Sequence, residues 1–276
     1  MIRIAKLIIG VMVICFIPFL ALSQEREPSP LDKVRWQRGP GIGELGDIAE
    51  VQIPEGYVFA DANDTRILME VMQNPISNTE LGFIGKAGAD WFLVFEFNKT
   101  GYIKDDEKNS LDTDAMLESI KKGNENANRE RAKRGWAPLN IVGWEQPPRY
   151  NPSTHNLEWA LKAESEGSPV INWNTRLLGR KGVMKVTLVA GPDILAQTLP
   201  YYQNLLSGFD YKSGNKYSEF RQGDKIAKYG LSALVVGGAA AVAAKTGILK
   251  YLWKGLIFVV IAVGAFFKKL FSRKKA

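Results

Sequence analysis

The stretch Asn156–Glu164, NLEWALKAE, decides the fold class. Apolar side chains at 157, 159, 161 and 163 alternate with polar side chains, and this period of two predicts a half-buried β-strand. A Glu-Gly-Ser-Pro turn at 166–169 leads into a second strand, 170–178. Gly179–Gly182 then turns the chain into a third, 183–189. Three strands joined by short turns predict an antiparallel meander.

The rest of the central region combines helices with hairpins. Trp91–Phe97 is apolar almost throughout and predicts a central strand, which the turn 98–101 is expected to pair with 102–104. Gln146-Pro147-Pro148 is expected to break the strand 139–144, because proline lacks the N–H that a sheet needs. This order predicts an α+β fold: a single domain with a mostly antiparallel sheet and two or three flanking helices, plus C-terminal membrane helices. Further strands are expected at 48–53, 57–59 and 209–217, and helices at 61–73, 112–133 and 193–206.

The two ends of the chain predict export and anchoring. Arg3 and Lys6 precede an apolar run, and Ala21-Leu22-Ser23 supplies the small residues of a signal-peptidase site. The apolar run 256–267 is followed by five basic residues, which favours one crossing with the tail inside; two short crossings are the alternative. The expected organisation is a cleavable signal peptide at 1–23, a flexible leader at 24–38, an extracytoplasmic domain at 39–224, a Gly/Ala-rich membrane-associated helix at 225–250, a transmembrane helix at 251–270 and a basic cytoplasmic tail at 271–276.

Charge and composition exclude several classes of function. The formal charge is +7, but residues 24–244 carry −3, so the domain lacks the positive surface of a nucleic-acid binder. Cys15 is the sole cysteine and lies in the signal, which leaves the mature chain without a disulfide or a thiol nucleophile. The sole histidine, His155, excludes a multi-histidine metal site, and no cofactor is expected.

An aromatic and proline-rich segment is the first candidate site. Exposed aromatic side chains that cluster are typical of interaction surfaces. His155 is also a candidate general base with Glu145 or Glu158 to orient it, although its turn context favours a surface role. The candidate binding residues are Trp136, Trp144, Pro147, Pro148, Tyr150 and His155.

The acidic triplet Asp105, Asp106 and Glu107 is the second candidate site. With Asp112 and Asp114, its carboxylates form a candidate calcium or magnesium site; a solvated hairpin end before a helix is the alternative. Residues 41–46 match GxGxxG, but a polar leader precedes them and an extended segment follows, which favours a glycine-rich turn over dinucleotide binding.

Several motifs, in this order, resemble one bacterial family, domain of unknown function 2167, whose members are described as predicted membrane-anchored proteins. The resemblance covers nearly the whole mature chain. It implies a bacterial envelope location, agrees with an anchor and implies no reaction. The motifs run from Gly39-Pro40 through Ile53-Pro54-Glu55-Gly56-Tyr57, Gly101–Glu107 and Glu130–Trp136 to Gly143–Tyr150 and Leu157–Ala160.

These observations predict a protein of the bacterial inner membrane whose main domain faces the periplasm. Its expected partners are the lipid bilayer and other envelope proteins, and its expected role is that of a binding, accessory or scaffold component, not an enzyme. One alternative is an envelope hydrolase that uses paired carboxylates among Asp105, Asp106, Glu107 and Glu145 on glycan or peptidoglycan. Another is a membrane-assembly protein that oligomerises through its Gly/Ala helix.

Overall fold

The computed structural model describes residues 30–86 and 88–237. The predicted signal peptide, the transmembrane helix at 251–270 and the basic tail lie outside these residues. Within the described ranges, no helix combines the length and apolarity needed to cross a membrane.

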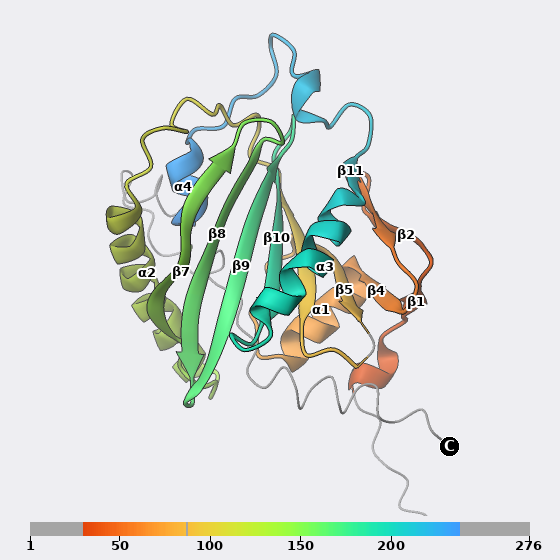
Figure 1. Cartoon of the computed structure of the whole chain (residues 1–276), viewed down its shortest axis with the longest axis vertical. Coiled ribbons are helices and arrows are strands. Elements are labelled where there is room, and N and C mark those ends of the chain that lie inside the picture. Colours follow the sequence, from red (N-terminus) through yellow and green to blue (C-terminus); the bar gives the residue numbers. More distant parts are fainter. Residues whose placement is uncertain (1–29, 87, 238–276) are drawn as a thin grey trace, which may run out of the picture.

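An antiparallel sheet of eight strands forms the centre of the domain (Figure 1). β6 and β10 lie in the middle and are almost wholly buried, as the apolar run at 91–97 predicts. The strands follow the order β1 (Gln37–Arg38), β4 (Tyr57–Asp61), β5 (Glu80–Lys86), β6 (Phe92–Asn98), β10 (Val183–Ala190), β9 (Ser168–Leu178), β8 (Asn156–Ser165) and β7 (Asn140–Asn151). A second sheet has the order β11 (Phe209–Tyr211), β3 (Ala49–Ile53) and β2 (Gly41–Leu45).

Helices cover both faces of the large sheet. On the face toward the viewer in Figure 1, α3 (Leu195–Ser207) and the small sheet pack over Phe95 and Met184. On the other face, α1 (Ala62–Val71) packs near β5 and β6, whereas α2 (Thr113–Lys133) and the short α4 (Leu231–Val235) pack near β8. Two short 3₁₀ helices complete the described elements: η1 (Pro30–Lys33) and η2 (Tyr217–Glu219).

The predicted meander and the antiparallel α+β class are confirmed. Strand β8 pairs with β9 from Asn156 to Ser165, and β9 pairs with β10 through the turn at 179–182. The expected helices also form, and side chains cap the first turns of α1 and α2. The Asp61 carboxylate accepts from two N–H groups at the start of α1, Asp112 caps α2, and Gly135 follows α2 with a positive φ.

Two glycines allow the small sheet to approach the large one. A Cβ atom at Gly43 or at Gly82 would lie within 2.9 Å of the Phe59 ring, so the ring fits between two glycine backbones. The glycines at 41 and 43 lie on β2, and Gly46 forms the turn to β3. The strand–turn–helix unit that a dinucleotide site requires is therefore not formed by this motif.

Several predicted elements differ from the structure. Residues 102–104 do not form a hairpin with β6, because β5 and β10 already occupy both of its edges. Pro147 and Pro148 do not end β7, since an edge strand tolerates proline and register shifts absorb the irregularity. The described part of the leader contains η1 and β1, and β1 pairs with β4. The described part of 225–250 contains α4, which packs into the domain.

Candidate functional site

Aromatic side chains gather at the end of the sheet where β7 joins β8. Tyr217 lies at the centre: its ring centroid is 4.4 Å from those of both Tyr102 and His155. Tyr102 in turn contacts Phe220 at 4.2 Å, and the Tyr150 hydroxyl lies 3.1 Å from His155 Nδ1. These five residues form the aromatic end. Phe220 is exposed and the other four side chains are half-buried.

Three segments far apart in sequence meet there. His155 lies in the β7–β8 turn with a φ of 52°, and Tyr150 closes β7. Tyr102 follows β6, where Gly101 has a φ of 102° and a Cβ would lie 2.5 Å from the Lys225 carbonyl oxygen. Only glycine therefore permits this close approach. The third segment is the strap, residues 212–230, which crosses the upper end of the sheet in Figure 1 and supplies Tyr217 and Phe220.

Hydrogen bonds fix the strap to the sheet. The Arg180 guanidinium donates to both carboxylate oxygens of Asp224, at 2.7 and 2.8 Å. Tyr102 N–H donates to the Lys225 carbonyl and Ala227 N–H donates to the Tyr102 carbonyl, both at 2.8 Å. The bidentate charged pair and the backbone bonds are geometrically restrictive, so the aromatic end is held in one arrangement.

The aromatic end carries little charge of its own. Burial, followed by the nearby Asp105 carboxylate, raises the pKa of Tyr150, and burial likewise raises the pKa of Tyr217. Both phenols stay protonated at neutral pH. The Tyr150 hydroxyl occupies His155 Nδ1, and the predicted orienting group Glu158 instead accepts from Thr175 Oγ1 at 3.2 Å. Glu158 is therefore engaged by Thr175, and the hydrogen-bond partner of His155 Nδ1 is the Tyr150 hydroxyl.

The predicted binding residues do not form one surface. Tyr150 and His155 belong to the aromatic end. Trp144 is half-buried beside α2 and donates from Nε1 to the Thr113 carbonyl at 3.2 Å, whereas Pro148 is buried and Pro147 exposed. Trp136 contacts the guanidinium groups of Arg131 and Arg134 after α2. Trp144 and Tyr150 pack against the same cluster but lie six residues apart on β7, so Trp144 is placed beside α2 and Tyr150 at the aromatic end.

The interpretation of Asp105, Asp106 and Glu107 as a metal site is not supported. Glu107 accepts a 2.8 Å hydrogen bond from the Ser232 N–H at the start of α4, and Asp105 pairs with Lys108 at 3.6 Å. Asp106 is exposed. Across residues 30–86 and 88–237, no three His, Cys, Asp or Glu side chains are grouped to hold a metal ion.

A row of buried charges was not predicted from the sequence. Glu80, Glu96, Lys185 and Arg176 are direct cross-strand neighbours on β5, β6, β10 and β9. Lys185 Nζ lies 3.2 Å from Glu96 Oε1. Burial lowers the pKa of Arg176 to about 10, although Glu96 opposes this effect, and its guanidinium stacks on Trp159. The available signal was a glutamate and a lysine inside otherwise apolar strands, which indicates a buried ion pair.

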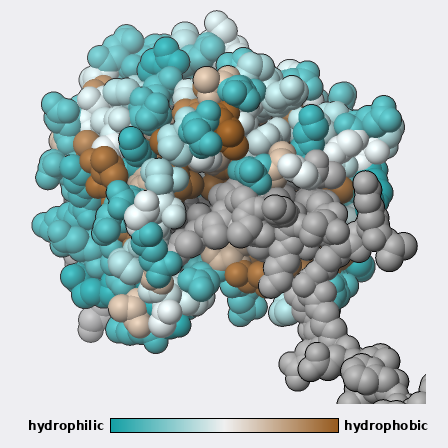
Figure 2. Space-filling view, turned by 60° about the horizontal axis from the view of Figure 1, so that its bottom comes forward, coloured by the Kyte–Doolittle hydropathy of each residue, from teal (hydrophilic) through white to brown (hydrophobic). Residues whose placement is uncertain are grey.

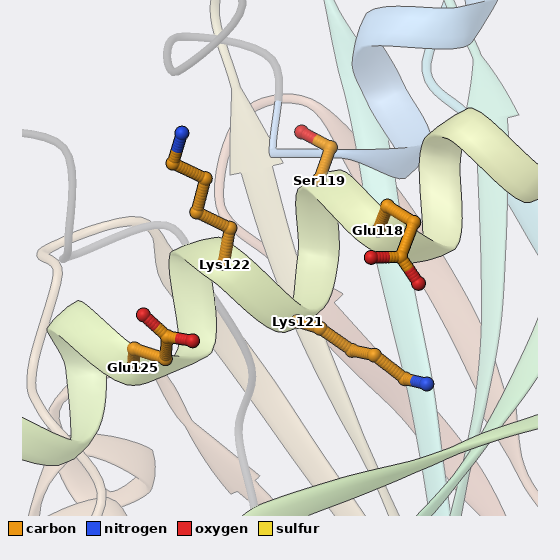
Figure 3. Close-up of a pocket in the computed structure, with 5 residues that line it drawn as sticks. All are labelled: Glu118, Ser119, Lys121, Lys122 and Glu125. Atoms are coloured by element: carbon orange, nitrogen blue, oxygen red, sulfur yellow. The ribbon is translucent and has the colours of Figure 1, made fainter.

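A surface hollow along α2 has no convergent chemistry. It is lined by Glu118, Ser119, Lys121, Lys122 and Glu125. Figure 3 shows that all five come from one helix, and that Ser119 and Lys122 point away from Glu118 and Lys121. These solvated side chains therefore do not make a second candidate site.

The protein is thus an antiparallel α+β domain with an aromatic end fixed by a strap. Over residues 37–267 the chain matches the family described as "Protein of unknown function (DUF2167)", and it belongs to that family. No curated protein shows significant sequence similarity.

Two solved structures show loose similarity. One is cyanobacterial PsbP (CyanoP) from Synechocystis sp. PCC 6803, with 13% identity, coverage of 64% of this chain and 93% of that chain, and a TM-score of 0.38. The other is the Ran-binding protein Mog1p of Saccharomyces cerevisiae, with 9% identity, coverage of 68% and 98%, and a TM-score of 0.31. We draw nothing about function from either.

Proposed function

We propose that this protein is a membrane-anchored, periplasm-facing scaffold that acts by binding and makes its contact through the aromatic end. The observation that carries the proposal is the assembly of that end from three distant segments, with Phe220 38% exposed at its edge. Large apolar side chains held rigidly at the surface contribute contact area at a low cost in side-chain entropy.

The carboxylates support binding over hydrolysis. A glycosidase of this kind needs two carboxyl groups that face each other across an open cleft. Glu80 and Glu96 both accept from Ser77 Oγ, at 2.8 and 3.4 Å, but they are only 0% and 1% exposed. They lie in the sheet interior. Among the acids at 105–107, Glu107 accepts from the Ser232 N–H and Asp105 pairs with Lys108, while Asp106 is exposed.

Photo-crosslinking from the aromatic end tests the proposed contact. A photoreactive phenylalanine analogue replaces Phe220 in the full-length protein, in cells, and replaces Val142 in a matched control, because Val142 is an exposed apolar residue on β7. We expect a reproducible light-dependent adduct from position 220 and none above background from 142. Equal adducts at both positions, or none at either, would refute the aromatic end as the contact surface.

Truncation tests the anchor separately. A chain that ends at Gly237 retains every described element but lacks the apolar run 256–267. We expect the full chain to sediment with membranes and to resist extraction by high salt and alkali, and the truncated chain to be released. A full chain that is extracted by salt alone would contradict anchoring by a membrane-spanning segment.

A further inference from the structure

The strap presents apolar and basic side chains to solvent together. Phe220 and Ile226 are 38% and 39% exposed, and both adjoin Tyr102, one by ring contact and the other by a backbone bridge. Three cations of the same segment, Arg221, Lys225 and Lys228, are also exposed.

The two acidic side chains of the strap, Asp224 and Glu219, accept hydrogen bonds from within the domain. Asp224 binds the Arg180 guanidinium and accepts from the Arg221 N–H, and Glu219 accepts from the N–H groups of Gly214 and Lys216. The carboxylates are thereby neutralised or directed at the backbone, while the cations face outward. An exposed pair of large apolar residues among cations is the pattern of a surface that sits at the boundary of an anionic bilayer.

The chain leaves the described domain from this same end. α4 packs with Leu157, Leu178 and Val183, which border the turns at the aromatic end. Thirteen residues, 238–250, lie between Gly237 and the apolar stretch that begins at 251, and a chain of this length spans at most about 50 Å. Figure 2, in which the lower end of Figure 1 comes forward, shows a face that is largely hydrophilic where it is not drawn in grey, with separate hydrophobic patches.

We propose that Phe220 and Ile226 insert at the surface of the bilayer that holds the anchor, while Arg221, Lys225 and Lys228 contact anionic lipid headgroups. This inference rests on the proposed function and names the partner of the aromatic end. The apolar side chains supply burial at the headgroup boundary, and each cation strengthens docking about fivefold. Docking fixes the orientation of the domain and leaves its opposite end free to meet other envelope components.

Site-directed spin labelling of the full-length protein in lipid nanodiscs tests the inference. Cys15 is replaced by serine, and a single labelled cysteine is placed at Ile226 or, as the control, at Val142. Discs contain either phosphatidylcholine alone or phosphatidylcholine with phosphatidylglycerol. We expect the label at 226 to collide several-fold less often with a water-soluble nickel reagent in the anionic discs than in neutral discs, and the label at 142 to be unchanged.

The charge variants separate the alternatives. Changing Arg221, Lys225 and Lys228 to glutamine should abolish the protection at 226, whereas the same change at Lys121, Lys122 and Lys133 of α2 should not. Raising the salt from about 0.05 to 0.5 M should weaken it, because the Debye length then falls below 5 Å. Protection that is equal in neutral discs, or a label at 226 as accessible as that at 142, would overturn the lipid proposal.

The failure of each proposal gives a different result. If the full chain does not enter discs, anchoring fails. The full chain can instead enter discs, give only protein adducts by photo-crosslinking at 220, and leave the label at 226 exposed. In that case the aromatic end stands as the contact surface, and the proposal of a lipid partner is wrong. Phospholipid adducts from position 220 would support both.

Discussion

Removing the Tyr211 hydroxyl should lower the free energy of unfolding of the domain. Tyr211 on β11 is buried, and its hydroxyl lies between β9 and β10: it donates to the Leu177 carbonyl at 2.7 Å and receives the Met184 N–H at 2.9 Å. Burial also raises the pKa of this phenol, so the Tyr211 hydroxyl stays protonated at neutral pH. The Tyr211→Phe variant keeps the ring and leaves both backbone groups without this partner.

The expected cost follows from those two contacts. A buried polar group left without a partner costs about 1–3 kcal/mol, so we expect Tyr211→Phe to lower the free energy of unfolding by about 3 kcal/mol. For a domain of about 200 residues, this corresponds to a fall in Tm of about 6–12 °C. The assay is urea unfolding of the full-length protein in detergent, followed by tryptophan fluorescence.

A second tyrosine supplies the control. Tyr201 is 49% exposed and its ring stacks on Trp91, an interaction that Tyr201→Phe preserves. We expect that variant to lie within about 0.5 kcal/mol of the wild type. If Tyr211→Phe also lowers the free energy of unfolding by less than about 0.5 kcal/mol, the two hydrogen bonds of the hydroxyl do not stabilise the domain. The reasoning from unsatisfied backbone groups is then refuted.

Three further predictions concern the strap, the buried charges and the sheet interface. The hydrogen-bonded ion pair with Arg180 holds the pKa of Asp224 at about 2, below its usual 3.8. The stabilisation that this pair gives the folded state is therefore complete above pH 4 and lost as the pH falls through 2. The Tm difference between wild type and Asp224→Asn should therefore shrink over that range, and a constant difference would contradict the pairing. Glu96→Leu should cost about 3–5 kcal/mol in urea unfolding, and adding Lys185→Met should recover part of it; strictly additive costs would contradict coupling. Gly82→Ala should cost about 1–3 kcal/mol by crowding the neighbouring ring, and a neutral result would show that the two sheets adjust freely.

Local patterns predicted the elements well but not all their partners. The alternation over 156–164 and the apolar run at 91–97 are signals that lie within one strand, so they identified β8 and β6. The hairpin expected at 102–104 does not form because β5 and β10 pair with the two edges of β6. β10, nearly ninety residues later, takes the place beside β6.

The candidate site was predictable only in fragments. Tyr150 and His155 were both candidate binding residues and lie side by side, whereas Trp144 is half-buried beside α2 and Pro148 is buried. Tyr217 was expected to end a strand over 209–217, but that strand ends at Tyr211 and Tyr217 begins η2. Phe220 carried no signal. The importance of both arises when the strap folds back over the sheet.

The sequence by itself determined the antiparallel α+β class, most helices and strands, and membership of its family, since each depends on local periodicity or on ordered motifs. Only the tertiary structure decided the row of buried charges, the use of Glu107 on α4 and the assembly of the aromatic end. The physical reason is separation along the chain. Strand register makes Glu96 and Lys185 neighbours, and the path of the strap brings Phe220 to Tyr102. Local sequence predicts neither the register nor the path.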